Sequence, residues 1–469
     1  MRCEVLGEQV ITRRAVSQPL RNRRRIRGGC AFTSAGLSLQ KSLLVGGCQP
    51  RWSVTFPASK LGDRIMVVNN PANDSIDDER AASQGPLTGL LIADFSRILA
   101  GPYATMLLGD LGATVIKVEG PAGDDTRTWK PPVRDGVSTY YLGINRNKRS
   151  IVLDLRKPDD LEVAKRLALA ADIMVENFKP GQIAGFGLGY DDLRVQNPGL
   201  IYASISGFGT RSPGAEMVGY DLMIQAMSGL MSLTGEPDGP AYRAGISVMD
   251  IIAGLHLSMG ILAALHQRSL SGEGQRVEVS LLASALSGLV NHTAAVTMGG
   301  VVPFRMGNAH PSLYPYDPFP TKDGELIVIA ANDGQFRKLT EVLGVPELAD
   351  DDRFRHNELR TANRVILGPL LAQQLLTKTS DEWFELLMAA RVPCAPIATV
   401  AEGIELARKV GLEPTVHLGE GADELEMIRN PITLSDTPPT YRHLPPDLDA
   451  DGDAIRAWIL GEHRADEEP

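Results

Sequence analysis

The chain has 469 residues, of which 43% are hydrophobic, 22% charged and 5% aromatic, the balance of an ordinary soluble globular protein. This composition excludes a chain that is disordered throughout, a collagen-like repeat and a disulfide-rich scaffold, and the length suggests two to four domains. The net charge of −10 argues against nucleic acid as the main partner, because a phosphate backbone selects basic surfaces.

Residues 1–65 differ from the rest of the chain in charge. Twelve basic and three acidic residues give this segment a net charge of +9, so the remaining residues together carry −19. Mitochondrial transit peptides are typically rich in arginine and poor in acids; the alternative is a wrongly assigned start, with translation beginning near Met66. We therefore expect residues 1–85 to be a basic extension that is disordered or serves targeting. The protein would be cytoplasmic if bacterial, or located in the mitochondrial matrix if the segment is a transit peptide.

Cysteine usage follows the same division. Cys3, Cys30 and Cys48 lie within the first 50 residues, and the body of the chain keeps only Cys394. A single thiol can form neither an intrachain disulfide nor a Cys-rich zinc site, which indicates a reduced, intracellular body.

From residue 89 onward, short apolar runs alternate with helical segments. Strands are predicted over residues 89–95, 113–119, 150–154, 172–176 and 200–205, with helices over residues 102–111 and 158–170. This alternation is typical of βαβ units and a mainly parallel sheet, so we expect an α/β fold. A helix over residues 251–266 is apolar almost all round and should be buried on most faces, and a strand over residues 275–280 follows it. We expect no membrane partner, because the apolar run of about 15 residues is shorter than a bilayer requires.

Residues 318–400 read as a smaller α/β unit. A hairpin is predicted around Lys322–Gly324, followed by helices over residues 334–343, 359–377 and 380–390. The segment from residue 401 onward is expected to contain strands and a last helix over residues 453–460.

General catalytic and ligand-binding motifs are absent from the sequence. It contains no GxGxxG, Walker A, HExxH or GxSxG pattern. The eight histidines lack metal-ligand spacing, and His256 and His266 on the apolar helix are expected to be structural, so we predict no metal site. Composition and spacing alone therefore indicate a large α/β protein of the enzyme type, without a particular chemistry.

Longer strings of residues carry a more specific signal. In order and at matching spacings, the chain resembles the family III CoA-transferases in Asp94–Glu119, Asn145–Ser150, Val175–Gly181, Ser206–Gly209, Gly219–Asp221 and Gly272–Gln275. This family includes formyl-CoA transferase, carnitine CoA-transferase and the α-methylacyl-CoA racemases, and the resemblance covers about residues 87–440. Three further strings, Gly123–Trp129, Ser138–Tyr141 and Gly307–His310, look most like the branch that uses succinyl-CoA and dicarboxylic acids, such as succinate–hydroxymethylglutarate CoA-transferase.

The resemblance implies an architecture and a set of partners. It implies a Rossmann-like large domain formed by both chain ends, a smaller inserted α/β domain, and an interlocked homodimer. Residues 86–300 would form the first part of the large domain, residues 301–400 the linker and small domain, and residues 401–469 the return to the large domain. The expected substrates are an acyl-CoA and small carboxylic acids; CoA arrives as part of the substrate and no tightly bound cofactor is expected.

Asp250 is the residue that the resemblance implies as catalytic. In family transferases a single aspartate attacks the acyl-CoA thioester, giving a mixed anhydride and then an aspartyl-CoA thioester. The chemistry requires an ionised carboxylate, and the start of the long apolar helix should favour that form through the helix dipole and free N–H groups. The structural alternative is that Asp250 only caps the helix, a preferred role for aspartate.

The resemblance also implies a CoA site. The residues at matching positions are Leu99, Ala100, Leu153, Arg156, Asn177, Phe178, Lys179, Tyr220 and Asp221. Arg156 and Lys179 would be the cations available to the CoA phosphates. Gly120 and Gly185 stand where formyl-CoA transferase has cations, so Arg127 or Arg149 is expected to supply the missing contacts.

Tyr220 separates the transferases from the racemases. The racemases place a histidine here, as one of the two acid/base groups that remove and return an α-proton. Tyrosine, with a reference pKa near 10, is a poor base at neutral pH, which favours a CoA-transferase over an α-methylacyl-CoA racemase or epimerase. The other alternative, a non-catalytic acyl-CoA-binding paralogue, is disfavoured by the intact Asp250.

Overall fold

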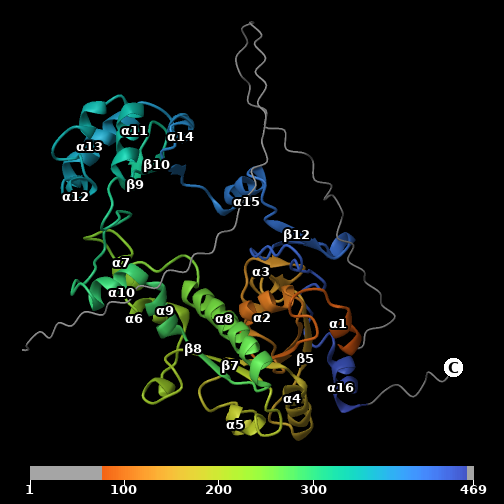
Figure 1. Cartoon of the computed structure of the whole chain (residues 1–469). Coiled ribbons are helices and arrows are strands. Elements are labelled where there is room, and N and C mark those ends of the chain that lie inside the picture. Colours follow the sequence, from red (N-terminus) through yellow and green to blue (C-terminus); the bar gives the residue numbers. More distant parts are fainter. Residues whose placement is uncertain (1–75, 462–469) are drawn as a thin grey trace, which may run out of the picture. The chain divides into compact units, whose positions relative to one another are not determined.

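Six parallel strands form one sheet in the computed structural model, which describes residues 76–461 (Figure 1). Their order is β5-β2-β1-β6-β7-β8, with β1 at Leu91–Asp94, β2 at Thr114–Glu119, β5 at Lys148–Val152, β6 at Ile173–Glu176, β7 at Ile201–Ser206 and β8 at Arg276–Ser280. This is the strand order of doubly wound dinucleotide-binding folds, in which the chain reverses direction beside its first strand. The α/β class and the parallel sheet predicted from the alternating pattern are confirmed.

Helices cover both faces of this sheet, which explains why its central strands are apolar on both sides. Every residue of β1, β2, β6 and β7 is buried. One face packs against α2 (Ala100–Asp110) and α8 (Val248–Ser271). The other face packs against α4 (Pro158–Ala170) and α16 (Gly452–Leu460).

Helix α8 is longer and more exposed than its sequence pattern predicted. Its Leu257 and Ile261 are fully buried, whereas Met259 is 63% exposed and Leu255 46% exposed. The prediction that this helix is buried on most faces is therefore wrong for the single chain. Among the described residues, α8 is also the one helix whose length and composition would allow it to cross a membrane. Ala253, Leu257 and Ile261 nevertheless lie in the hydrophobic core with the sheet.

A second sheet and its helices form a smaller unit with its own core. Strands β9 (Tyr316–Pro320), β10 (Glu325–Ile329) and β11 (Cys394–Pro396) are antiparallel in the order β11-β10-β9. Their helices are α11 (Asp333–Leu343), α12 (Asn357–Ala362), α13 (Arg364–Leu375) and α14 (Ser380–Ala389). The predicted hairpin is confirmed, but the single helix predicted over residues 359–377 is two. The break is at Asn363, whose side-chain amide donates to the Leu359 carbonyl at 2.9 Å.

The remaining elements are short. They are α1 (Ile76–Ala82), β3 (Val133–Arg134), β4 (Val137–Ser138), α3 (Thr139–Leu142), α5 (Tyr190–Leu193), α6 (Asp221–Met227), α7 (Leu230–Leu233), α9 (Leu281–Gly288), α10 (Val290–Thr297), α15 (Val400–Lys409), β12 (Thr415–Leu418) and β13 (Leu425–Ile428).

Segments from both ends of the described chain pack on the large sheet unit. The Thr440 N–H donates to the Asp110 carbonyl at 2.7 Å, and the Arg442 guanidinium donates to the Ala113 carbonyl at 2.9 Å. At the other end, Glu79 of α1 forms an ion pair with Arg149 at 2.5 Å. Helix α1 falls inside the range 1–85 assigned to an extension, so packed chain begins at least as early as Ile76, which is buried. The expectations for residues 1–65 concern a segment outside the described residues, and the domain boundaries stay predictions.

Candidate active site

The point where the sheet reverses direction lies between β1 and β6, and in doubly wound folds ligands bind outside the carboxyl ends of the strands there. The loops that follow these two strands are joined by one side chain. The Arg97 N–H donates to Asn177 Oδ1 at 3.0 Å, and Asn177 Nδ2 donates to the Arg97 carbonyl at 2.7 Å. The structure therefore brings together the two loops that carry Leu99 and Ala100 on one side and Asn177, Phe178 and Lys179 on the other.

The loop after β1 is held in an unusual conformation. Ile98 has a φ of +72°, which is costly for a β-branched side chain and persists only where the surroundings fix it. The Ile98 N–H donates to the Asp124 carboxylate at 3.2 Å, and Asp124 is held by Lys117 Nζ at 2.8 Å. The loop is thus clamped from Asp124 as well as from Asn177.

Beneath this loop lies a buried network of charged side chains. Lys117 and Lys148 are fully buried; Lys117 pairs with Asp124, and Lys148 pairs with Asp94 at 3.1 Å. Burial raises the pKa of the Asp94 carboxyl, but the two lysines lower it further, so this pKa lies below its ordinary value. Lys117 also donates to the Ser96 carbonyl at 3.1 Å. Asp94, Ser96 and Lys117 of the string Asp94–Glu119, on which the resemblance rests, therefore help to fix the loop.

Asp250 is the third residue of α8 and does not cap the helix. The carboxylate at the helix start belongs to Asp221, whose Oδ1 accepts from the Met249 N–H at 2.7 Å and the Asp250 N–H at 3.2 Å. Within residues 76–461, the Asp250 side chain has no hydrogen-bond partner. The capping alternative is therefore wrong for Asp250, because Asp221 supplies the carboxylate at the helix start. The CoA contact that the resemblance implies for Asp221 stays a prediction.

The electrostatics of Asp250 are the reverse of what its position in sequence suggested. Burial of the carboxyl, together with the charge of Asp221, raises the pKa of Asp250 from 3.8 to about 7. We expected the helix N-terminus to favour the anion, but the N–H groups of Met249 and Asp250 are occupied by Asp221. The result is a partly buried and unusually basic carboxylate, a combination that marks candidate functional groups.

Close packing of two helices places Asp250 near the loop after β1. A Cβ on Gly254 would lie 2.6 Å from the Ala100 carbonyl oxygen, so α8 and the start of α2 touch at a position that needs glycine. Asp250 lies four residues earlier on the same helix face, about 6 Å along the axis. The candidate nucleophile is therefore about one helical turn from the contact with Ala100.

Tyr140 of α3 is a site residue that sequence reasoning missed. Its hydroxyl lies near the Ser247 side chain at the start of α8, and its ring packs edge-on against that of Trp129, with the ring centroids 5.3 Å apart. Burial raises the pKa of Tyr140, with further contributions from Asp250 and Asp221, so the hydroxyl keeps its proton. The string Ser138–Tyr141 had indicated a branch of the family, but no spacing could link it to a helix about a hundred residues later.

The cations expected to bind phosphate are unequally available. Lys179 is exposed, and within the described residues it has no ion-pair partner. Arg156 is exposed but forms a two-bond pair with Asp154, at 2.7 and 2.9 Å. Arg127 is held by Glu119 at 2.7 Å, and Arg149 is buried. Arg127 and Arg149 both pair with carboxylates of the fold, so the expectation that one of them replaces the missing family cations gains no support from these contacts and stays a prediction.

The other predicted contacts differ in exposure. Leu99, Ala100 and Leu153 are buried, whereas Tyr220 is 58% exposed. Arg97, which the sequence did not single out, is exposed on the loop after β1 and pairs with Asp125 at 3.2 Å. Gly120 and Gly185 have no neighbouring atom within 4 Å of the place where a side chain would stand.

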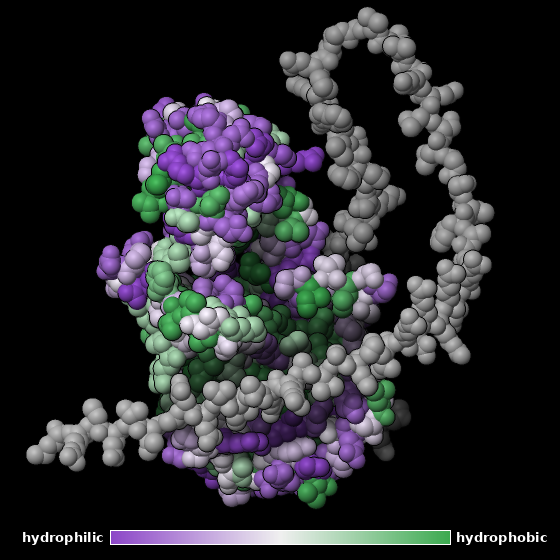
Figure 2. Space-filling model, turned by 60° about the vertical axis from the view of Figure 1, so that its left-hand side comes forward, coloured by the Kyte–Doolittle hydropathy of each residue, from purple (hydrophilic) through white to green (hydrophobic). Residues whose placement is uncertain are grey.

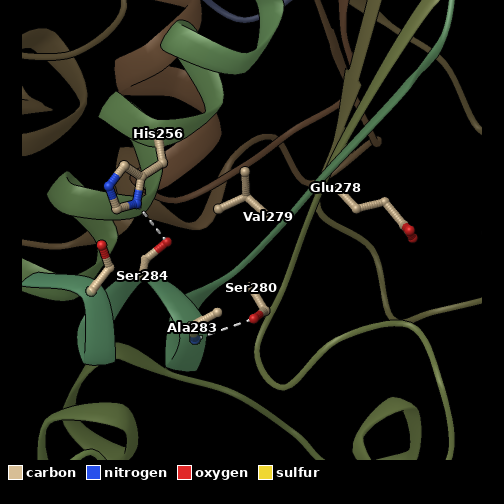
Figure 3. A pocket seen from close by; sticks show the side chains of 7 residues that line it. His256, Glu278, Val279, Ser280, Ala283 and Ser284 are labelled. Carbon is tan, nitrogen blue, oxygen red and sulfur yellow. Dashed lines mark hydrogen bonds between the residues drawn. The ribbon is translucent and has the colours of Figure 1, made fainter. Parts of the chain in front are cut away.

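A separate pocket of about 280 Å³ lies between α8, β8 and α9 (Figure 3). His256 Nδ1 and Ser284 Oγ are 3.0 Å apart there, and Glu278 points away from them. The sequence prediction of a structural role for His256 agrees with this satisfied hydrogen bond. Within residues 76–461, no group of three or more His, Cys, Asp or Glu side chains is arranged to hold a metal ion.

Comparisons with known proteins identify the family. Residues 87–452 match the model of CoA-transferase family III. A succinate–glutarate CoA-transferase of Agrobacterium fabrum is 41% identical over 372 residues, covering 77% of this chain and 93% of that protein. A succinyl-CoA:glutarate CoA-transferase of Mus musculus is 42% identical, covering 73% and 77% respectively. The crystal structure of a CAIB/BAIF family protein from Brucella suis is 41% identical with a TM-score of 0.72, covering 80% of this chain and all of that one. The chain therefore belongs to CoA-transferase family III and is an enzyme of that family.

Proposed function

We propose that the enzyme moves CoA between dicarboxylic acids, with succinyl-CoA as donor and glutarate or a similar diacid as acceptor, through covalent catalysis by Asp250. The names of its relatives from Agrobacterium fabrum and Mus musculus support the substrate class. The observation that carries the mechanism is the Asp250 carboxyl, which is basic, partly buried and without a hydrogen-bond partner in the described chain, near the clamped loop at the switch point.

The proposed reaction balances without a cofactor or a redox step. An Asp250 oxygen attacks the thioester carbonyl, the C–S bond breaks, and CoA leaves as a thiolate from a mixed anhydride. The thiolate attacks the aspartyl carbonyl of that anhydride, which releases the donor acid and leaves an aspartyl-CoA thioester. The acceptor carboxylate then attacks the aspartyl carbonyl and expels the thiolate, which finally attacks the acceptor carbonyl. The new acyl-CoA leaves and the Asp250 carboxylate is restored.

The surroundings of Asp250 suit this role. A nucleophile gains reactivity with basicity, and an aspartate of ordinary acidity would be a weak attacking group. Burial next to Asp221 supplies the basicity, while the fixed start of α8 holds the carboxylate in place. The protonated hydroxyl of Tyr140 near the same helix start is suited to donate a hydrogen bond to a substrate oxygen.

CoA would bind across the switch point, held by the loops after β1, β5 and β6. Lys179 is the exposed cation on these loops best placed for phosphate, because within the described residues no carboxylate pairs with it. Arg97 and Arg156 would each have to share their charge with a carboxylate, Asp125 and Asp154 respectively. The open space beside Gly120 and Gly185 leaves room for the ligand where other family members carry cations. CoA enters and leaves with the substrates, so the reaction needs no resident cofactor.

We further propose that the enzyme works as an interlocked homodimer. Hydrophobic residues gather across the middle of the face shown in Figure 2. Large apolar side chains are exposed on four helices: Leu222, Met223 and Met227 on α6, Leu255, Met259 and Leu262 on α8, Leu286 on α9, and Val290 and Val296 on α10. Exposed apolar surface of this extent marks a protein interface, and a second copy would cover the outer face of α8. Sedimentation velocity tests this assignment, and a monomer at working concentration would contradict it.

A racemase would need a second acid/base group, and the chain lacks the histidine that supplies it in racemases. Tyr220 stands where racemases have histidine, and it is exposed. A non-catalytic role is disfavoured by the basicity of Asp250. The cytoplasmic or mitochondrial location depends on residues 1–65 and stays a prediction.

Incubation with succinyl-CoA and a panel of acids tests the proposed function. Glutarate, oxalate and acetate would be offered separately, and new CoA thioesters would be read by mass. We expect transfer to diacids and loss of turnover by several orders of magnitude in Asp250→Asn, because the nucleophile disappears. Transfer at the normal rate by Asp250→Asn would overturn the mechanism, and transfer only to acetate would overturn the substrate class.

A further inference from the structure

Asp221 lies at the centre of a buried hydrogen-bond cluster that joins α6 to the start of α8. Its carboxylate accepts from the Met249 and Asp250 N–H groups and, on its other oxygen, from Gln225 Nε2. Gln225 is fully buried; its Nε2 also donates to the Ile246 carbonyl at 3.2 Å, and its Oε1 accepts from the Ala244 N–H at 2.8 Å. The Gln225 side chain thus fixes both Asp221 and the segment that leads into α8.

The charge of Asp221 is placed where it acts on Asp250. A nearby like charge disfavours ionisation of a carboxylate, whereas hydrogen bonds from N–H donors favour the ionised form. Asp221 has three N–H donors, while Asp250 has no side-chain partner within residues 76–461. The other titratable group facing Asp250 is Tyr140 of α3, which is neutral, and no lysine or arginine of the described chain pairs with Asp250. The like charge of Asp221 is therefore not compensated.

We propose that Asp221 is a positioning residue of the transfer reaction: its charge, fixed by Gln225 and the first turn of α8, makes the neighbouring Asp250 a stronger nucleophile. This inference rests on the proposed nucleophilic role of Asp250. The Asp221 carboxylate is buried and turned toward α8, which suits this role better than the CoA contact implied by the resemblance.

The test is the pH dependence of kcat/KM in Asp221→Asn. An asparagine oxygen can still accept from the first turn of α8, so the contact with the helix start is kept while the charge is removed. The asparagine amide group cannot accept from Gln225 Nε2, so that one hydrogen bond is lost with the charge. Because only ionised Asp250 attacks, we expect the acid limb of the profile to move to lower pH by about one unit. We also expect kcat above pH 8 to fall several-fold, since the nucleophile is less basic, with KM for succinyl-CoA within twofold of the wild type.

Each role of Asp221 predicts a different result. A purely structural role predicts lower kcat at every pH and an unmoved profile, and a CoA contact predicts a raised KM; either outcome would overturn the inference. Asp221→Glu, which keeps the charge, should keep the profile of the wild type. If Asp221→Asn does not fold by circular dichroism, Asp221→Ser removes the same charge and can also accept from the helix start. Full activity in Asp250→Asn would instead refute the proposed function itself, so the two failures are distinguishable.

Discussion

Replacing Asp250 by asparagine should stabilise the protein at alkaline pH while abolishing turnover. The pKa of Asp250 lies at about 7 in the folded chain and at 3.8 for an unperturbed aspartate. The folded state therefore binds the proton more tightly than the unfolded state, so the free energy of unfolding of the wild type falls as the pH rises from about 4 to 7. The shift of about three pKa units lowers the free energy of unfolding of the wild type by at most about 4 kcal/mol above pH 7. An asparagine at this position carries no charge, so the variant avoids this loss.

Urea unfolding of both proteins at several pH values measures the difference. At pH 8 we expect Asp250→Asn to have the larger free energy of unfolding, by up to about 4 kcal/mol. The difference should shrink as the pH falls and vanish near pH 4, where the wild-type carboxyl is also neutral. Contributions from titrating groups that do not interact with Asp250 cancel, because they are common to both proteins; Asp221 and Tyr140 interact with Asp250 and are the exceptions.

Asp238→Asn is the matched control, since Asp238 is exposed and its replacement should leave the pH dependence unchanged. A stability difference that is the same at pH 5 and pH 8 would refute the reasoning. A variant less stable than the wild type at pH 8 would show that the Asp250 anion is stabilised by its surroundings.

Three further predictions concern other parts of the chain. Gly254→Ala should lower the free energy of unfolding in urea by about 1–3 kcal/mol and reduce kcat, because the new Cβ would lie 2.6 Å from the Ala100 carbonyl oxygen. The control is Gly403→Ala in α15, which has open space around the new Cβ and should not destabilise the protein. Tyr220→Phe should change the activation free energy of CoA transfer by no more than about 1 kcal/mol. The wild type should not exchange the α-proton of a 2-methylacyl-CoA with deuterated water, and rapid exchange would favour the racemase. A chain starting at Met66 keeps α1 and its Glu79–Arg149 pair, so its melting temperature and activity should equal those of the full chain, and a large loss would show that residues 1–65 pack on the body.

The sequence determined the features that depend on local pattern. Alternating apolar runs predicted the parallel sheet, and the helix predicted over residues 158–170 has the same bounds as α4, because Pro158 at its start and an apolar face are both local signals. The resemblance identified the family and the candidate nucleophile from strings of residues. One element boundary failed at Asn363, where the side-chain amide donates to the Leu359 carbonyl four residues earlier and one helix gives way to the next; this contact is local, but apolar periodicity does not report it.

Only the tertiary structure decided which side chains serve the site. Asp221 reaches the start of α8 from 28 residues upstream, and Tyr140 reaches it from α3, about a hundred residues earlier. The sequence could not show that Arg127 pairs with Glu119 and Arg149 with Glu79, because the partners lie on other elements. Periodicity reports which face of an element is apolar. Capping, ion pairing and the pKa of Asp250 depend on distances of a few ångströms between segments that are far apart in sequence, and no local pattern encodes those distances.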